Sequence, residues 1–283
     1  MSTTQETETL REWRDSARFW KKHLQTIRPM FAPVTSALIE EAGIKPGDKV
    51  LDVAGGPGEP SLTIAEYLGP SGMVLCTDAI PEMVAAAETE AQQRGITNVQ
   101  FRCCTADSLP LDDDQFDAAV SRLGVMFFRD PLVGLREMLR VTKPKGRVSL
   151  AVWAKSELNP FSYIVTNVIS RYFDAPSNTP SPSEGAFRFA EPGVLASVLL
   201  EAGASPITER VLKFDIRAPV SPAGFWEMRS ETSGTLREKL QMLSTERKEQ
   251  VAQEVQEAAR DYFPNNEMRF PAQMIIVTGQ KPN

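Results

Sequence analysis

A glycine-rich turn is the first feature of this sequence that could support chemistry. Gly55, Gly56 and Gly58 come directly after the apolar run 49–53. Glycines at such a place let the backbone turn sharply and let a ligand approach the main chain closely. The turn could hold a nucleotide at a helix N-terminus, or it could be only a tight turn. An NAD-binding fingerprint would need one more glycine at the position that Ser61 occupies.

Three aspartates, Asp52, Asp78 and Asp107, stand at or just after the ends of successive apolar runs. In a parallel sheet these strand ends meet at one edge, so we expect the three carboxylates side by side. Like charges at close range disfavour a pyrophosphate and favour a ligand with positive charge and free hydroxyls. Asp78 would accept from ribose hydroxyls, Asp107 from an exocyclic amine, and Asp52 would face an ammonium directly or through water. Taken singly, Asp78 and Asp107 could instead be helix caps or turn residues.

The composition excludes several function classes. The 283 residues carry a formal net charge of -6 and no Lys/Arg-rich block, which argues against nucleic-acid binding. No apolar run is long enough to span a membrane and the N-terminus has no secretory signal, so we expect a cytoplasmic protein. Cys76, Cys103 and Cys104 are too few for a disulfide framework or a zinc site by themselves, and His23 is the only histidine, so we expect no metal. We interpret Cys103 and Cys104 as inert packing residues.

The elements that must position these residues follow from hydrophobic periodicity. Apolar runs and amphipathic segments alternate, which is typical of a parallel sheet with helices on both faces. We predict strands at 49–53, 73–77, 99–103, 116–121, 147–152, 211–217 and 273–279. We predict helices at 9–28, up to about 41, and at 59–68, 81–94, 132–140, 158–173, 191–202 and most of 222–263, with a Pro/Ser-rich loop at 174–188.

The fold class that follows is α/β: a doubly wound, seven-stranded, mostly parallel sheet with a helical cap. We expect the cap over the carboxyl ends of the strands, where such sheets bind ligands. The predicted division is N-terminal cap helices 1–42, a cofactor-binding core 43–155, a cap insertion 156–185, a core continuation 186–218, a helical cap insertion 219–265 and a last core strand 266–283.

Several motifs, in order and at matching spacing, resemble one enzyme family. Residues 52–58 (DVAGGPG) resemble the first motif of class I S-adenosylmethionine-dependent methyltransferases, and 76–84 (CTDAIPEMV) resemble the second. Residues 103–122 are similar to the next two motifs, and 136–153 to the segment that leads to the fifth strand. The resemblance covers about residues 45–155, and the Ala-Gly-Gly form of the first motif is most similar to the ubiquinone/menaquinone methyltransferase-like (methyltransferase type 11) branch. Lys145 departs from the family's glycine in a turn at the opposite end of the sheet.

The resemblance implies S-adenosylmethionine as the cofactor and a set of residues that hold it. The glycines would lie against its methionine part, Asp78 on the ribose, Met83 on the adenine face and Asp107 at the adenine amino group. The implied set is Asp52, Ala54, Gly55, Gly56, Gly58, Asp78, Ala79, Met83, Ala106, Asp107, Ser108, Ser121, Arg122 and Leu123. Arg122 either forms a structural ion pair or faces the methionine carboxylate or an acidic acceptor; both interpretations stay open.

On the acceptor side, the candidate residues are Trp20, His23, Phe127 and Trp153. The aromatic side chains could line an apolar pocket or simply belong to the core, and the N-terminal helices could form a lid. His23 is a candidate general base because its pKa normally lies near neutrality, although the adjacent Lys21 and Lys22 suggest a solvated helix face.

The function that the sequence predicts is methyl transfer from S-adenosylmethionine to a small, partly apolar acceptor, such as a secondary metabolite. One alternative is a quinone-type C-methyltransferase, and the insertion 219–265 favours a dedicated cap for a different acceptor. Another is a cofactor-binding module without turnover. An NAD-dependent oxidoreductase is disfavoured because the further glycine is absent. We expect a small-molecule acceptor as the partner, no nucleic acid and no membrane span.

Overall fold

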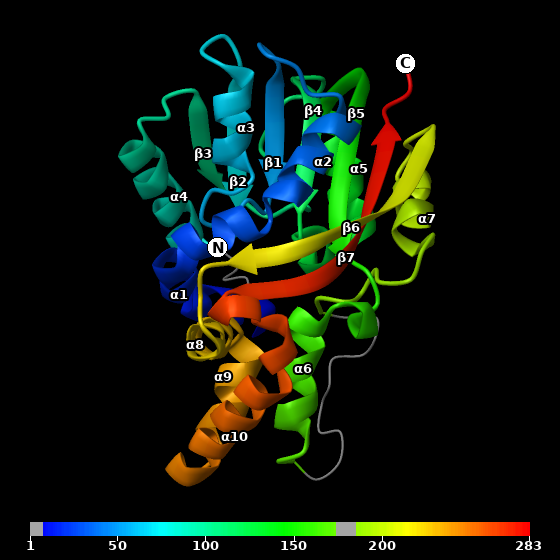
Figure 1. Cartoon of the computed structure of the whole chain (residues 1–283). Coiled ribbons are helices and arrows are strands. Elements are labelled where there is room, and N and C mark those ends of the chain that lie inside the picture. The colour runs from blue at the N-terminus through cyan, green and yellow to red at the C-terminus, as the bar shows by residue number, and fades with distance from the viewer. Residues whose placement is uncertain (1–7, 174–184) are drawn as a thin grey trace, which may run out of the picture.

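A computed structural model describes residues 8–173 and 185–283 and contains a seven-stranded sheet in the order β3-β2-β1-β4-β5-β7-β6 (Figure 1). The strands are β1 (Lys49–Val53), β2 (Met73–Asp78), β3 (Val99–Cys103), β4 (Phe116–Arg122), β5 (Thr142–Trp153), β6 (Ile207–Ala218) and β7 (Met268–Gln280). Strands β1 to β5 pair in parallel, and β7 pairs antiparallel with both β5 and β6. The predicted fold class is therefore confirmed.

Helices cover the sheet on both faces, as the buried strands require. In Figure 1, α2 and α3 lie in front of the sheet, with α5 and α7 behind it. The helices are α1 (Glu8–Met30), α2 (Ala32–Ala42), α3 (Ser61–Leu68), α4 (Pro81–Arg94), α5 (Pro131–Val141), α6 (Pro160–Ser170), α7 (Val194–Glu201), α8 (Pro222–Thr232), α9 (Gly234–Gln241) and α10 (Thr245–Ala258). Single turns of 3₁₀ helix are η1 (Val125–Phe127), η2 (Ser156–Leu158), η3 (Arg260–Tyr262) and η4 (Pro264–Asn266). None of the helices described is long and apolar enough to cross a membrane.

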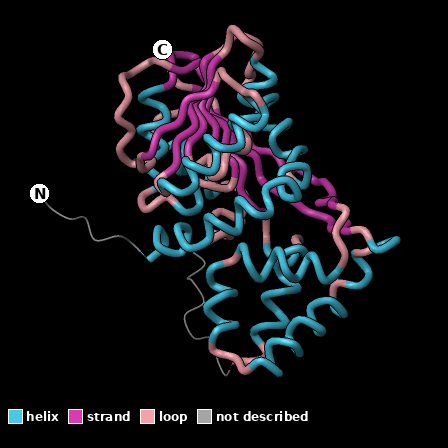
Figure 2. The backbone as a smooth tube through the Cα atoms, turned by 90° about the vertical axis from the view of Figure 1, so that its left-hand side faces the viewer, coloured by secondary structure: helices cyan, strands magenta, loops and turns pink. Residues whose placement is uncertain are grey.

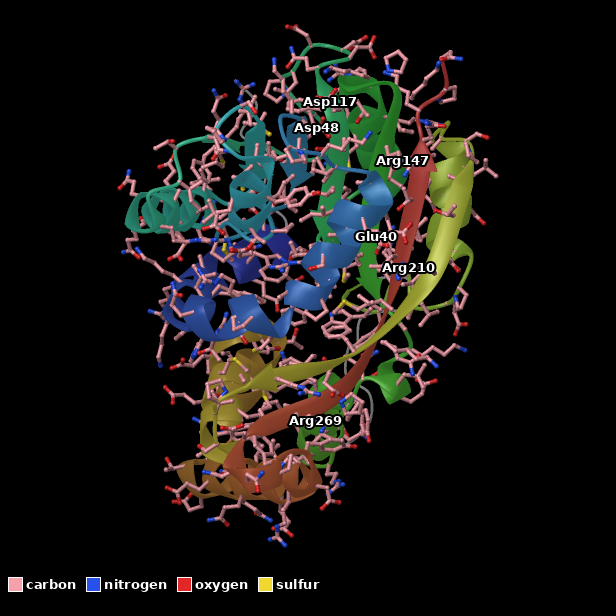
Figure 3. The ribbon with its side chains drawn as sticks, turned by 45° about the horizontal axis from the view of Figure 1, so that its top comes forward. Glu40, Asp48, Asp117, Arg147, Arg210 and Arg269 are labelled. Atoms are coloured by element: carbon pink, nitrogen blue, oxygen red, sulfur yellow. The ribbon has the colours of Figure 1, made fainter. Side chains whose placement is uncertain are left out.

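Charged side chains hold α2 against the far strands of the sheet. Arg210 on β6 forms an ion pair with Glu41 (2.6 Å) and a longer one with Glu40 (3.3 Å). Arg147 on β5 donates to the carbonyl oxygen of Glu41 at 3.1 Å. Figure 3 shows Glu40, Arg147 and Arg210 on this outer surface. These contacts stabilise the scaffold and lie outside the predicted site.

A group of helices lies beyond the carboxyl ends of the parallel strands. Helices α6, α8, α9 and α10 gather there, and Figure 2 shows α1 between this group and the sheet. An aromatic cluster joins the group to β7: the rings of Phe225 and Phe270 are 5.0 Å apart, and those of Tyr262 and Phe270 are 4.7 Å apart. Phe161 on α6 packs on Phe225 at 5.6 Å. Helices thus lie on the side of the molecule where the parallel strands end, and their role as a cap stays a prediction.

Several predicted boundaries differ from the structure. The predicted strand 211–217 extends over all of β6 because antiparallel pairing with β7 continues from Ile207 to Ala218. The predicted helical stretch 222–263 breaks into α8, α9 and α10 since the side chains of Ser233 and Ser244 cap new helices there. Most of the predicted loop 174–188 lies outside the described residues.

Candidate functional site

The glycine-rich turn leaves β1 in a backbone conformation that glycine favours. Ala54 (φ 60°), Gly56 (φ 55°) and Gly58 (φ 111°) all lie in the left-handed region. A Cβ atom at Gly55 would come within 2.6 Å of the Cys76 sulfur and 2.8 Å of Asp52 Oδ2, whereas a Cβ atom at Gly56 would meet nothing within 4 Å. The turn is therefore packed tightly on its inner side and open at Gly56, where a ligand can reach the main chain.

Asp78, at the end of β2, is locked in place by two backbone amides. Its Oδ2 accepts from the Gly56 amide at 2.9 Å and its Oδ1 accepts from the Ile80 amide at 2.9 Å. Burial raises the pKa of Asp78, and these hydrogen bonds oppose that shift. The bond to the Ile80 amide is the contact expected of an ordinary turn aspartate, which was one interpretation of Asp78. The bond to the Gly56 amide additionally connects Asp78 to the glycine turn. Each oxygen keeps a lone pair for a ligand hydroxyl.

Asp52 lies deeper than the sequence analysis placed it. The strand continues to Val53, and the parallel register sets Asp52 beside Cys76 and Val120, two residues before the level of Asp78. Its carboxyl group is fully buried and accepts from Ser61 Oγ at 2.5 Å, while its Oδ1 has no hydrogen-bond partner among the described residues. Burial raises the pKa of Asp52 to about 7, although Ser61 and the charge of Arg122 oppose the shift.

Asp107 is half-buried and follows β3, with Ala106 beside it and Ser108 exposed. The loop that carries them starts against Asp78, because the amide of Cys104 donates to the Asp78 carbonyl oxygen at 3.0 Å. Of the predicted cysteine pair, Cys103 is exposed and Cys104 intermediate. The three aspartates thus belong to the ends of the neighbouring strands β1, β2 and β3 but lie at different depths: Asp52 within β1, Asp78 at the end of β2 and Asp107 in the loop after β3.

Helix α1 covers the segment after β2. Met83 is 3% exposed and clusters with Ile80 and with Ala17 of α1. Trp13 and Trp20, also on α1, pack against this cluster, and the Trp13 ring stands edge-on to Phe127 at 5.0 Å. The buried Trp20 Nε1 atom has no hydrogen-bond partner within the described parts of the chain. The structure therefore brings together Met83, Trp20 and Phe127 from the predicted set.

The end of β4 closes the other side of the turn. Ser121 Oγ donates to the Val53 carbonyl oxygen at 2.8 Å, and Leu123 has a left-handed backbone (φ 61°). Next to it, a Cβ atom at Gly124 would lie 2.6 Å from the Cβ of Ala54. The two strand ends are thus in direct contact, which leaves no room for larger side chains.

Arg122 binds neutral acceptors and links the turn to α2. Its guanidinium donates to Thr35 Oγ1 at 2.9 Å and to the Glu59 carbonyl oxygen at 3.0 Å, and it lies 5.9 Å from the Phe31 ring centroid. Burial lowers the pKa of Arg122, whereas the carboxylates of Glu59 and Asp52 act in the opposite direction. Among the described residues Arg122 therefore forms hydrogen bonds and no ion pair, so the interpretation as a structural ion-pair partner is wrong, and the contact with a ligand carboxylate stays a prediction.

The remaining acceptor candidates, Trp153 and His23, lie in two separate places. Trp153, at the end of β5, packs edge-on against Phe31 at 5.9 Å and tilted against Phe187 at 6.4 Å. His23 faces α8 instead, where its Nε2 lies 2.6 Å from Glu231 Oε2. Lys22 donates to the same carboxylate at 2.8 Å. Burial raises the pKa of Glu231, but the hydrogen bonds from Lys22 and His23 outweigh it and hold that pKa below its usual range. His23 thus connects α1 with α8 and is not part of the aromatic group formed by Trp153, Phe31 and Phe187.

Sequence reasoning missed two partners of the site. Ser61, noted only because it is not glycine, is the hydrogen-bond donor of Asp52. Glu59, two residues before it, pairs with Arg94 at 2.6 Å and so fixes the turn to α4. A serine in the first turn of the helix that follows a buried acid is the signal that could have identified Ser61, whereas Glu59 precedes that helix and gives no such signal.

Comparisons with known proteins show which family part of this chain resembles. Residues 35–172 match the model of the ubiE/COQ5 methyltransferase family. An uncharacterized protein of Mycobacterium tuberculosis is 38% identical over 124 residues, which cover 44% of each chain. The ubiquinone/menaquinone biosynthesis C-methyltransferase UbiE of Cellvibrio japonicus is 37% identical over 118 residues, or 41% of this chain and 47% of that protein. The chain thus spans about half the length of the curated relatives it matches.

Solved structures share the fold at low sequence identity. The YcgJ protein of Bacillus subtilis superposes with a TM-score of 0.56 at 22% identity, over 88% of this chain and 98% of its own. Phosphoethanolamine N-methyltransferase 2 of Haemonchus contortus, in complex with S-adenosyl-L-methionine, gives 0.58 at 14% identity, over 100% of this chain and 62% of its own. The predicted resemblance to S-adenosylmethionine-dependent methyltransferases of the ubiE type is confirmed for the matched segment.

The buried carboxyl of Asp52 predicts a pH dependence of stability. A pKa of about 7 in the folded chain exceeds the ordinary 3.8, so between about pH 4 and pH 7 the folded state holds a proton that the unfolded state has released. The stability difference between wild type and Asp52→Asn, measured as the free energy of unfolding, should therefore change with pH. It should decrease by on the order of 4 kcal/mol as the pH rises across this window and then level off. Urea unfolding from pH 4 to pH 8 measures it.

A second variant sharpens this test. Ser61→Ala removes a hydrogen bond that favours the ionised carboxyl, so the decline should continue above pH 7 in that background. A wild-type profile that runs parallel to that of Asp52→Asn between pH 4 and pH 7 would contradict the account.

Proposed function

We propose that this chain, whose residues 35–172 match the model of the ubiE/COQ5 methyltransferase family, transfers a methyl group from S-adenosylmethionine to a small, partly apolar acceptor. The observation that carries the proposal is the Asp78 carboxylate fixed against the open Gly56 turn. A carboxylate held there fits a ligand with vicinal hydroxyls, and the space beside Gly56 fits a ligand that lies against the main chain. The buried Oδ1 of Asp52 has no hydrogen-bond partner in the parts of the chain that the structure describes, which fits a positively charged ligand group nearby.

Each part of the cofactor has residues that suit it. In our proposal the turn around Gly55, Gly56 and Gly58 holds the methionine part, together with Ala54 and the strand end Ser121, Arg122 and Leu123. Asp78 and Ala79 hold the ribose. The adenine lies between Met83 and the loop of Ala106, Asp107 and Ser108. The apolar character of the cluster around Met83 supports this arrangement, because such a surface suits an aromatic ring. Since Ala17 of α1 covers Met83, the proposal requires α1 to shift when the adenine binds.

The bound cofactor supplies an activated methyl group on a sulfonium. The chain's own residues then have to orient the acceptor and exclude water, which can account for several kcal/mol of the barrier. We propose that Trp20, Phe127 and Trp153 do so, with α1 as part of a lid. We also retain the division into core segments (43–155, 186–218, 266–283) and cap segments (1–42, 156–185, 219–265) as part of this proposal.

A quinone-type C-methyltransferase is the second candidate, and the identity to UbiE proteins over this segment favours it. Turnover to S-adenosylhomocysteine with short-chain quinols and with non-quinoid phenols and amines separates the two, since only the quinone-type candidate requires a quinol. Cofactor binding without turnover on any of these acceptors would favour a binding module. We propose the cytoplasm as the compartment, since the three cysteines are free thiols.

The cofactor assignment predicts a loss of affinity when its acidic partners are removed. Asp78→Ala combined with Asp107→Ala should weaken S-adenosylmethionine binding by about 100-fold or more, because two charge-assisted hydrogen bonds disappear. Isothermal titration with S-adenosylmethionine and, separately, with NADH measures this. Asp112→Asn, an exposed carboxylate of the loop after Asp107, is the matched control and should bind as wild type does. Wild-type affinity in the double variant, or binding of NADH alone, would overturn the assignment.

For His23 we propose a role as a clamp between α1 and α8. The hydrogen bond between Nε2 and Glu231 engages one ring nitrogen of a side chain that is only 12% exposed. His23→Gln should therefore lower the thermal midpoint and reduce kcat less than tenfold, whereas loss of a general base costs about 10²–10⁴-fold. A drop of that size, with an unchanged midpoint and the loss of one limb of the pH–rate profile, would make His23 the base.

A further inference from the structure

Helix α1 packs differently along its length. Its C-terminal half belongs to the main core, in which Met30 is 1% exposed. Its N-terminal half, residues 8–20, rests instead on a small separate cluster that Ala17 forms with Ile80 and Met83 of the segment after β2. Because the stabilisation from apolar burial scales with the buried area, this small cluster holds a helix less strongly than the main core does. The N-terminal half is therefore the part of α1 that separates from the sheet at the lower cost.

The contact with this cluster leaves one polar group unsatisfied. Trp20 packs against the cluster from α1, and its buried Nε1 atom has no hydrogen-bond partner among the residues that the structure describes. The neighbouring ring of Trp13, 5.9 Å away between centroids, carries only an N–H donor of its own. A buried donor without an acceptor costs about 1–3 kcal/mol. The seated position of α1 is weakened by this cost, which contact of the indole N–H with water would remove.

Polar contacts with α9 hold the N-terminal half of α1 in place. Glu12 Oε1 accepts from the amide of Thr235, in the first turn of α9, at 2.8 Å. Ser16 Oγ accepts from Arg237 Nη2 at 2.7 Å. Gly234, the first residue of α9, leaves room for the first of these contacts, because a Cβ atom there would overlap the Glu12 side chain. The seat of α1 on the cluster is thus supported from α9.

The covered cluster is also part of the proposed cofactor site. In that proposal the adenine lies on Met83, yet Ala17 covers this side chain and leaves it 3% exposed. The adenine and the N-terminal half of α1 therefore require the same surface, and they exclude each other. When a binding surface is free in only a fraction of the molecules, the apparent affinity for the ligand is reduced by that fraction.

We propose that the N-terminal half of α1 is an autoinhibitory strap: in the free chain it occupies the surface that takes the adenine, and the cofactor binds only when the strap has separated. This inference rests on the proposed function and states how access to that same site is regulated. A contact that stabilises the seated strap lowers the affinity for the cofactor, and its removal raises that affinity. A helix that only closed over the bound cofactor would give the opposite sign.

Two variants release the strap without changing the proposed site. Gly234→Ala forces the Glu12 side chain away from α9 and raises the helix propensity of α9 at the same time. Glu12→Ala removes the acceptor of the Thr235 amide. In isothermal titration both should bind S-adenosylhomocysteine about three- to tenfold more tightly than wild type, because the loss of one hydrogen bond raises the fraction of open chains. Without ligand, the amides of residues 8–20 should exchange hydrogen faster in both variants than in wild type.

Matched controls test whether the gain is specific. Gly224→Ala changes a glycine in the first turn of α8, where a Cβ atom would meet nothing closer than 3.5 Å. Glu40→Ala removes an exposed carboxylate that pairs with Arg210 outside the predicted site. Both controls should bind S-adenosylhomocysteine as wild type does and should leave hydrogen exchange in residues 8–20 unchanged.

The possible outcomes separate the strap from the proposed function. Binding that is equal or weaker in Gly234→Ala and Glu12→Ala, or hydrogen exchange in the strap that stays as in wild type, would overturn the strap and leave the proposed function standing. An equal gain in affinity in the two controls would also overturn the strap. Binding to the two strap variants alone, with none to wild type, would support both proposals. If no variant binds S-adenosylhomocysteine, the proposed function fails and the strap fails with it.

Discussion

The structure depends on one contact: the hydrogen bond from the Gly56 amide to the Asp78 carboxylate. It joins the turn after β1 to the end of β2. The parallel register of these two neighbouring strands determines how deeply Asp52 lies relative to Asp78. Glycine conformation alone would leave the turn free to move, and the aspartate alone would be an ordinary turn residue. Together they create a fixed carboxylate beside an open stretch of main chain. The paired strand end at Ser121, the buried Asp52 below and the arginine that spans to α2 all support that arrangement.

Much of this could be predicted from the sequence because the informative signals are local. Apolar runs, capping residues and the glycine turn identify the strands, their order of appearance and the edge where Asp78 and Asp107 emerge. Two of the errors have non-local causes. Strand β6 extends further than its alternating pattern indicates since β7 pairs along its whole length. Asp52 is buried because the register with β2 places it below the strand end, and register is a property of two segments that sequence periodicity does not contain.

Arg122 was hard to interpret for the same reason. It was considered as a structural ion-pair partner or as a contact of an acidic ligand group. In the structure it donates to Thr35 Oγ1 and to the Glu59 carbonyl oxygen, and both acceptors come from segments far from β4 in the sequence.

The central claim is that the Gly56–Asp78 arrangement holds the ribose of S-adenosylmethionine. A crystal structure of the chain with S-adenosylhomocysteine tests it most directly. The account predicts the two ribose hydroxyls within hydrogen-bond distance of the Asp78 carboxylate and the methionine part against the glycine turn. A ligand bound elsewhere, or ribose hydroxyls that contact other residues while Asp78 keeps only its backbone partners, would contradict it.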